Sequence, residues 1–204
     1  MRPRERSRND FVDAAIKIVD EKGLDALTLR RLGDEVGVSF TSVYTYFSSR
    51  EALVAALVEY VATEAINGVA EFEGSSRDQL VAIALSVRSS LSRHPRLAQA
   101  FMTSTNATTS SNAATLAVVS ILQIAGLSGS ELVSAYRVLE SYVIGVTVFD
   151  LGAAPHHLEI RQSRYRDVLL REFAAVAKSE QAVQSHNNQS FLKGLNILLD
   201  GLGV

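Results

Sequence analysis

The chain has 204 residues and a formal net charge of −2, with 47% hydrophobic and 21% charged residues. This composition can bury a sizeable core and excludes a disordered or collagen-like chain. The absence of cysteine excludes disulfides, thiolate metal sites and thiol nucleophiles, and it fits a reducing cytoplasm. No apolar run approaches the roughly 18–20 uncharged residues of a membrane span, and the arginine-rich start lacks the apolar stretch of a secretory signal. We therefore expect a cytoplasmic protein with no membrane partner.

Residues 1–8 form a basic arm in which the only acidic residue is Glu5. Its basic residues are Arg2, Arg4, Arg6 and Arg8. A short basic arm suits a polyanion such as nucleic acid, but many such arms are merely solvated chain ends. Taken alone, the arm leaves both interpretations open.

Residues 9–52 show the periodicity of a compact helical domain. The first helix has an apolar stripe at i, i+4, i+7 and i+8, made of Phe11, Ala15, Ile18 and Val19. Gly23 predicts the end of this helix, and Thr28 is a plausible N-cap for a short second one. The inner face of the second helix consists of Leu29, Leu32 and Val36. Gly37 then predicts its end, and with it a tight turn.

A third helix follows this turn at once. It is expected to open at Val38 and Ser39 and to point Val43 and Phe47 inward, at i and i+4. The Ser-x-x-Glu spacing that begins at Ser48 is typical of a capping box. We therefore expect a fourth helix to start there and to run to about residue 72.

Residues 28–47 thus predict a helix-turn-helix, in which the second helix protrudes so that its side chains reach base edges in the major groove of DNA. Its outward residues are Phe40, Thr41, Ser42, Tyr44, Thr45 and Tyr46. None of them is acidic, and their hydroxyl and methyl groups suit contacts with bases and phosphates. The alternative is an ordinary helical hairpin with an exposed face of serine, threonine and tyrosine. Exposed aromatic side chains and the nearby basic arm favour DNA binding.

Residues 9–57 resemble the DNA-binding domain of the tetracycline-repressor (TetR) family of bacterial regulators. The matching residues are Ala14-Ala15, Gly23, Thr28-Leu29-Arg30-Arg31-Leu32, Gly37-Val38-Ser39, Val43-Tyr44, Tyr46-Phe47 and Arg50-Glu51-Ala52-Leu53. The resemblance implies phosphate contacts by Ser42, Tyr44, Tyr46 and Arg50, base reading by Phe40, Thr41 and Thr45, and a groove contact by Arg30. Tyr46 stands where histidine is common, and Arg50 where lysine is common. Phe40 replaces an often polar residue, and it either contacts a thymine methyl or packs against Tyr44.

The rest of the chain predicts further helices and no strands. They cover about 77–93, a segment beginning at Pro95, and then about 113–125, 129–152, 156–179 and 189–202, with a polar loop at 103–112. The predicted fold class is all-α, with a three-helix helix-turn-helix domain before a helical ligand-binding and dimerisation domain. We expect the arm to occupy residues 1–8, the DNA-binding domain 9–52 and the helical body 53–204.

Regular apolar stripes in the body indicate a core or a helix–helix interface. One stripe consists of Leu132, Tyr136, Leu139, Val143 and Val146, and another of Phe191, Leu195, Leu198 and Leu202. A second apolar face on the helix 129–152 favours a homodimer. Tyr142-Val143-Ile144-Gly145 and residues 194–202 also resemble the sensor domain of the tetracycline-repressor branch, where a magnesium–drug chelate is bound. Because Phe149 stands at the position that matches the family's carboxylate ligand, we do not expect the metal in this chain. No cofactor is expected.

The candidate effector lining is apolar and aromatic, which suits a flat hydrophobic ligand. It consists of Leu97, Phe101, Met102, Leu116, Val119, Leu139, Tyr142, Val143, Val146 and Phe149. Plain core packing would explain the same residues. The loop 103–112, polar and placed between apolar helices, is a candidate gate for such a pocket.

These observations favour a homodimeric repressor that binds a palindromic operator in double-stranded DNA and is released by a small apolar or aromatic effector. The alternative is a ligand-independent DNA-binding or protein-sensing helical module. An enzyme is not expected, because a helical-bundle enzyme needs inward clusters such as paired Glu-x-x-His motifs, and the sequence contains none.

Overall fold

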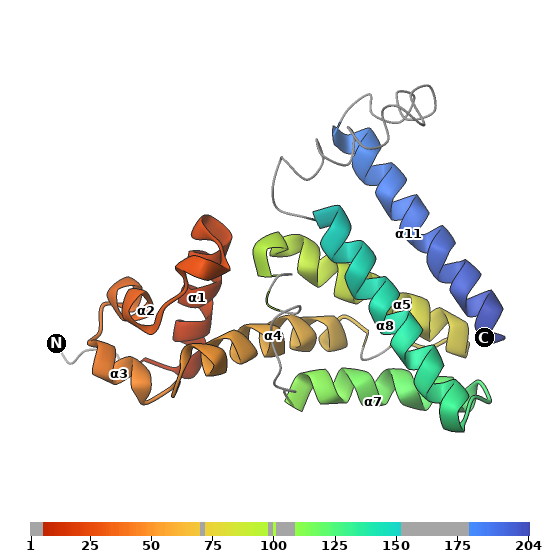
Figure 1. Cartoon of the computed structure of the whole chain (residues 1–204), viewed down its shortest axis with the longest axis horizontal. Coiled ribbons are helices and arrows are strands. Elements are labelled where there is room, and N and C mark those ends of the chain that lie inside the picture. Colours follow the sequence, from red (N-terminus) through yellow and green to blue (C-terminus); the bar gives the residue numbers. More distant parts are fainter. Residues whose placement is uncertain (1–5, 70–71, 98–99, 101–108, 152–179) are drawn as a thin grey trace. The chain divides into compact units, whose positions relative to one another are not determined.

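A computed structural model (Figure 1) describes residues 6–69, 72–97, 100, 109–151 and 180–204. Within these ranges all regular elements are helices, as the all-α prediction requires. They are α1 (Arg8–Lys22), the 3-10 turn η1 (Leu24–Ala26), α2 (Leu29–Val36), α3 (Phe40–Tyr44), α4 (Arg50–Asn67), α5 (Ser76–Arg93), the 3-10 turn η2 (Pro95–Leu97), α7 (Thr109–Ile124), α8 (Gly129–Leu151) and α11 (Glu180–Leu202). The predicted fold class is confirmed for the described part of the chain.

The chain divides into two compact units, each built from two segments. The first contains residues 1–71 and 86–117, and the second contains 72–85 and 118–204. Helices α5 and α7 therefore each contribute to both units. The C-terminal half of α5 and the turn η2 belong to the same unit as the helix-turn-helix.

Helix α1 begins with a reciprocal cap. The Ser7 hydroxyl accepts a hydrogen bond from the backbone N–H of Asp10 at 3.3 Å, and the Asp10 carboxylate accepts one from the backbone N–H of Ser7 at 2.7 Å. Two amide groups that the helix leaves unpaired are thereby satisfied. The predicted stripe of α1 is buried throughout, and Gly23, with φ of 83°, ends the helix.

The turn between α2 and α3 depends on two glycines. Gly37 adopts a left-handed conformation, φ 74° and ψ 37°, which a side chain would strain. Gly33 lets α3 approach α2, because a Cβ atom there would lie 3.1 Å from the Val38 carbonyl oxygen and 3.3 Å from Val43 Cγ2. The glycine turn expected from the sequence is therefore present, and close helix packing fixes the start of α3.

Several predicted boundaries were wrong. The N-cap of α4 is Ser49 rather than Ser48, and the Ser49 hydroxyl accepts a hydrogen bond from the Ala52 N–H at 3.2 Å. The hydrogen bond between the Ser49 side chain and Glu51 lowers the pKa of the Glu51 carboxyl. Helix α4 ends at Asn67 rather than near residue 72. Gly68 follows, where a Cβ atom would approach the Ser86 hydroxyl to 2.5 Å. A local cap thus marks the start of the helix, and close packing against Ser86 of α5 marks its end.

Two further boundaries moved in the body. Helix α7 begins at Thr109, inside the segment predicted as the polar loop 103–112, and α11 begins at Glu180 rather than near residue 189. Tertiary context overrides the weak helix propensity of such polar runs. Residues 103–108 and the predicted helix 156–179 lie outside the described residues.

In the second unit, α8 and α11 pack against each other (Figure 1). The Tyr142 ring stacks on Phe191 at a centroid distance of 5.7 Å, and its hydroxyl donates to the Phe191 carbonyl at 2.9 Å. Gly194 of α11 leaves space for the Tyr142 side chain, since a Cβ atom at Gly194 would come within 2.8 Å of Tyr142 Cζ. Arg77 of α5 adds an ion pair to Asp200 at 2.9 Å.

Helix α8 is long and apolar enough to cross a membrane by length and composition, with a mean hydropathy of 1.4 over Gly129–Asp150. Core and interface helices meet the same criterion. Val133, Val138 and Phe149 are exposed on this helix, whereas Ala135, Leu139 and Val143 are buried. Within the described residues, α8 therefore has exposed apolar side chains in addition to its buried stripe, whereas Ile144 and Val148 of the predicted second face are half-buried.

Candidate nucleic-acid interface

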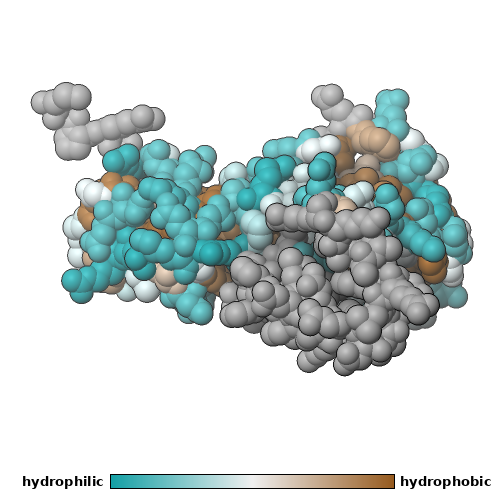
Figure 2. Space-filling model, turned by 90° about the horizontal axis from the view of Figure 1, so that it is seen from above, coloured by the Kyte–Doolittle hydropathy of each residue, from teal (hydrophilic) through white to brown (hydrophobic). Residues whose placement is uncertain are grey.

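Helix α3 is held by its cap and by two inward residues. The Ser39 hydroxyl accepts from the backbone N–H of Ser42 at 3.3 Å. Val43 and Phe47 are 0% and 2% exposed, so the opposite face of α3 points away from the core. Figure 2 shows that hydrophilic residues dominate the visible face of the N-terminal helices, at the left, with smaller hydrophobic areas between them.

The predicted DNA-contacting residues fall into two groups by exposure. The exposed ones are Arg30, Phe40, Thr41, Tyr44 and Thr45, and the half-buried ones are Ser42, Tyr46 and Arg50. The exposed group lies on α2, on α3 and at the C-cap of α3, and it contains no carboxylate. This surface can therefore approach a phosphate backbone without a like charge on α3 to repel it.

Phe40 and Tyr44 form an exposed aromatic pair on α3. Their ring centroids are 4.8 Å apart and the planes meet at 89°, an edge-to-face arrangement. Phe40 therefore packs against Tyr44, whereas its contact with a thymine methyl stays a prediction. Both rings nevertheless keep 45% and 48% of their surface exposed, so that the pair presents an apolar edge on the α3 surface.

Arg50 binds within the protein. Its Nε donates to the Leu27 carbonyl and its Nη2 to the Leu24 carbonyl, both at 2.9 Å. The Arg50 guanidinium group on α4 thereby holds η1 and its C-cap residue Leu27 in place just before α2. Sequence reasoning missed these bonds, because nothing in the local pattern around Arg50 indicates a partner more than twenty positions away.

We predict that Arg50→Ala lowers the free energy of unfolding by about 1–3 kcal/mol, since two partly buried carbonyl groups would lose a charged donor. Urea unfolding followed by circular dichroism measures this. Arg30→Ala is the matched control, because Arg30 is exposed, and it should change stability little. Equal stability of the Arg50 variant and the wild type would contradict the structural role of these bonds.

Tyr46 and the start of the chain form the next group of contacts. The Tyr46 ring lies 4.6 Å from Phe11, and its hydroxyl donates to the backbone carbonyl of Arg6 at 2.6 Å. The Arg6 Nη2 donates to the carbonyl of Val36, the last residue of α2, at 3.1 Å. Arg8 lies over the Phe47 ring at 5.4 Å. Residues 6–8 of the basic arm are therefore attached to the helix-turn-helix.

An exposed ion pair braces α1 against α2. Lys17 Nζ lies 2.7 Å from Glu35 Oε1. This hydrogen bond raises the pKa of Lys17 and lowers that of Glu35, so both groups are charged at neutral pH. The Glu35 carboxylate on α2 is thus paired with a lysine, and the exposed face of α3 has no acidic side chain.

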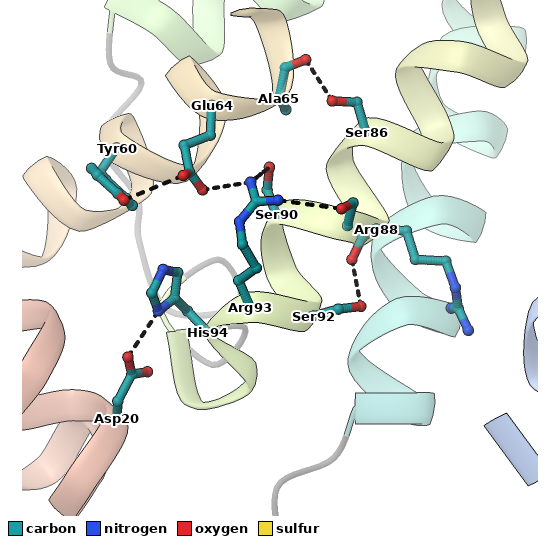
Figure 3. A network of polar contacts seen from close by, with 11 residues as sticks. Asp20, Tyr60, Glu64, Ala65, Ser86, Arg88, Ser90, Ser92, Arg93 and His94 are labelled. Atoms are coloured by element: carbon teal, nitrogen blue, oxygen red, sulfur yellow. Dashed lines mark hydrogen bonds and ion pairs between the residues drawn. The ribbon is translucent and has the colours of Figure 1, made fainter. Parts of the chain in front are cut away.

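A polar network connects α1 and α4 to the end of α5 within the first unit (Figure 3). Glu64 accepts from Arg93 at 2.9 Å and from the Tyr60 hydroxyl at 3.3 Å. His94 Nδ1 lies 2.8 Å from Asp20 Oδ2. Burial, and then the charge of Glu64, raise the pKa of Tyr60, so its phenol stays protonated and donates. The end of α5 is thus fastened to the helices that carry α3.

A groove of about 400 Å³ lies between α1 and α4. It is lined by Arg8, Asn9, Val12, Asp13, Ala56, Glu59, Tyr60, Thr63, Glu64 and Asn67. This lining is mixed in polarity and shares no residue with the predicted effector pocket.

The structure places the predicted effector-lining residues in different environments. Leu97, Leu139 and Val143 are buried, whereas Leu116 and Phe149 are 64% and 57% exposed. The half-buried members are Val119, Tyr142 and Val146, and the side chains of Phe101 and Met102 lie outside the described residues. Leu97 and Leu116 belong to the first unit and the other described members to the second. Within the described residues no three His, Asp or Glu side chains gather as a metal site.

These features define a helix-turn-helix DNA-binding protein. They are the helices α2 and α3 joined by the Gly37 turn, the exposed face of α3 without acidic side chains, and the basic residues attached to it. Residues 11–57 match the model for bacterial regulatory proteins of the tetR family. Residues 68–204 match the tetracyclin repressor-like C-terminal domain. The chain therefore belongs to the tetR family of transcriptional regulators, which are not enzymes.

Among curated proteins, the chain is 30% identical over 134 residues to the HTH-type transcriptional repressor DrrR1 of Streptomyces coeruleorubidus. That match covers 66% of this chain but only 50% of the relative's length. A possible TetR family transcriptional regulator from Streptomyces coelicolor A3(2) has the same fold, with a TM-score of 0.79, 22% identity and coverage of 96% of this chain and 98% of that one. BioQ with its double-stranded DNA operator gives a TM-score of 0.67 at 22% identity, over 98% of this chain and 99% of that one.

Proposed function

We propose that the protein is a cytoplasmic homodimeric repressor that binds a palindromic operator in double-stranded DNA and leaves it when a small apolar or aromatic effector binds. The observation that carries the proposal is the capped, acid-free exposed face of α3, which is built on the buried residues Val43 and Phe47. The relative DrrR1 is a transcriptional repressor, and BioQ was crystallised with its operator.

On DNA, the exposed tip of α3 would enter the major groove. Thr41, Thr45 and Phe40 would read base edges, since threonine and phenylalanine can contact thymine methyl groups. Contacts to phosphates would come from Ser42, Tyr44 and Arg50, and Arg30 would reach the groove from α2. Arg50 has spare donors for a phosphate, because a guanidinium carries five N–H groups and two carbonyl bonds do not use them all.

Exposed apolar side chains on α8 and α11 support the homodimer. Val133 and Val138 are exposed on α8, and Ile197 is exposed on the neighbouring helix α11. Such side chains would form an interface if a second subunit covered them together, since contiguous apolar patches are typical of interaction sites. A two-fold dimer would also present two α3 helices to half-sites about 34–36 Å apart, which is why the operator is proposed to be palindromic.

The effector would bind in the helical body, and its lining would include Tyr142 and Val146 of the second unit. Binding would shift the population between two spacings of the recognition helices, through α4, with no chemical step. The body's match to the tetracyclin repressor-like domain supports a ligand-binding role for this part of the chain.

Two measurements test the proposal. Sedimentation of the purified protein should give a dimer, and gel shifts at moderate salt should show binding to a palindrome in the DNA upstream of its own gene. A monomer at micromolar concentration, or no binding to any palindrome there, would contradict it. If binding is found but no apolar or aromatic compound weakens it, the alternative of a ligand-independent module is correct.

A further inference from the structure

The Tyr46 hydroxyl has a partner that its expected role does not explain. The family resemblance assigns this position to a direct phosphate contact, but the hydroxyl donates its hydrogen bond at 2.6 Å to the carbonyl of Arg6, forty positions earlier. A phenol has one hydrogen to donate, so while this bond exists the group cannot also donate to a phosphate. The Tyr46 ring is fixed as well, by its contact with Phe11 at 4.6 Å.

Arg6 is held at its other end too. Its guanidinium donates at 3.1 Å to the carbonyl of Val36, at the negative end of the α2 dipole, where a cation is favoured. Val36 immediately precedes the Gly37 turn, so this bond places a positive charge at the junction between α2 and α3. Arg6 is exposed, and most of the five N–H donors of its guanidinium remain available.

Resting on the proposed DNA-binding function, we propose that Arg6 is a phosphate-contacting residue of the DNA interface and that Tyr46 is its positioning residue. Tyr46 acts through the Arg6 carbonyl and does not itself touch DNA. A free basic chain end loses conformational entropy when it binds DNA. Because Arg6 is already held in place before DNA binds, less entropy is lost and binding is stronger.

The salt dependence of binding separates the two roles of Tyr46. A cation on a phosphate releases counterions and adds about 0.9 to the slope of log affinity against log salt, whereas a neutral hydroxyl on a phosphate adds nothing. Tyr46→Phe keeps the ring on Phe11 and removes only the hydroxyl. Because this electrostatic term is independent of sequence, a fluorescent duplex of arbitrary sequence serves as the probe alongside the DNA upstream of the gene.

We expect Tyr46→Phe to weaken binding to both duplexes by about 3- to 10-fold at moderate salt. The salt slope should fall by about 1 for each subunit whose Arg6 no longer contacts a phosphate. In a chain that lacks residues 2–6, the same substitution should have no further effect. The matched control is Tyr44→Phe, whose exposed ring lies on α3. Its effect should be the same with and without the arm, and it should leave the slope unchanged.

An unchanged salt slope for Tyr46→Phe, or an equal loss of affinity in the presence and absence of residues 2–6, would overturn the positioning role in favour of a direct hydroxyl contact. No loss at all would also overturn it. Thermal unfolding should be close to wild type for each variant, and a large drop would mean that Tyr46 acts on the fold and not on the arm. If the wild-type chain binds neither duplex, the proposed function itself fails, an outcome distinct from the others.

Discussion

Thr41→Asp is expected to weaken DNA binding by about 100-fold or more at moderate salt, while the protein stays folded. A carboxylate about 5 Å from a phosphate costs roughly 1–3 kcal/mol at surface dielectric values, and a dimer would meet this cost twice. Thr41 is exposed in the first turn of α3, where the helix dipole favours a negative charge. Fluorescence anisotropy with the DNA upstream of the gene measures the loss.

The control for this substitution is Thr41→Asn, which has nearly the same shape as the aspartate and carries no charge. It should change base preference modestly and keep binding within about 10-fold of wild type. Unfolding temperatures of both variants should stay near the wild-type value. Strong DNA binding by the aspartate variant would show that the exposed face of α3 does not approach DNA.

Gly194→Ala is expected to destabilise the helical body by about 1–3 kcal/mol, although alanine normally stabilises a helix relative to glycine. The added Cβ atom would overlap the Tyr142 hydroxyl and come within 2.8 Å of Cζ. The Tyr142 ring has little room to retreat, because it stacks on Phe191 and its hydroxyl binds the Phe191 carbonyl. Urea unfolding measures the change.

Gly201→Ala is the matched control on the same helix, since a Cβ atom there would meet nothing within 4 Å. It should leave stability unchanged or raise it slightly. Combining Gly194→Ala with Tyr142→Ala should remove most of the added destabilisation, because the atom that blocks the methyl group is gone. If Gly194→Ala and Gly201→Ala unfold alike, α8 and α11 do not pack as closely as the structure has them.

Local patterns predicted the helix-turn-helix well. Phe11, Leu32, Val43 and Phe47 were expected to point inward and are all buried. These residues could be predicted because the period of a helix is a property of neighbouring residues. The Gly37 turn could be predicted for the same reason, since its left-handed conformation is one that a side chain would strain.

Boundaries were harder wherever neighbouring residues carry equal signals. Ser48 and Ser49 are both good caps, and only the folded chain selects Ser49. The polar residues at the start of α7 and of α11 have little apolar periodicity, so the pattern did not indicate that they are helical. The effector lining had the same difficulty, because a stripe such as that of Leu139 and Val143 serves a core and a pocket equally.

The sequence by itself determined that the chain is helical, where the helix-turn-helix lies and which family it resembles, because these depend on spacing along one or two helices. Only the tertiary structure decided that Arg50 binds the carbonyls of η1, that Tyr46 holds Arg6, and that His94 meets Asp20. Each of these bonds joins residues more than twenty positions apart. Their geometry depends on how helices pack, and no local pattern of residue types contains that information.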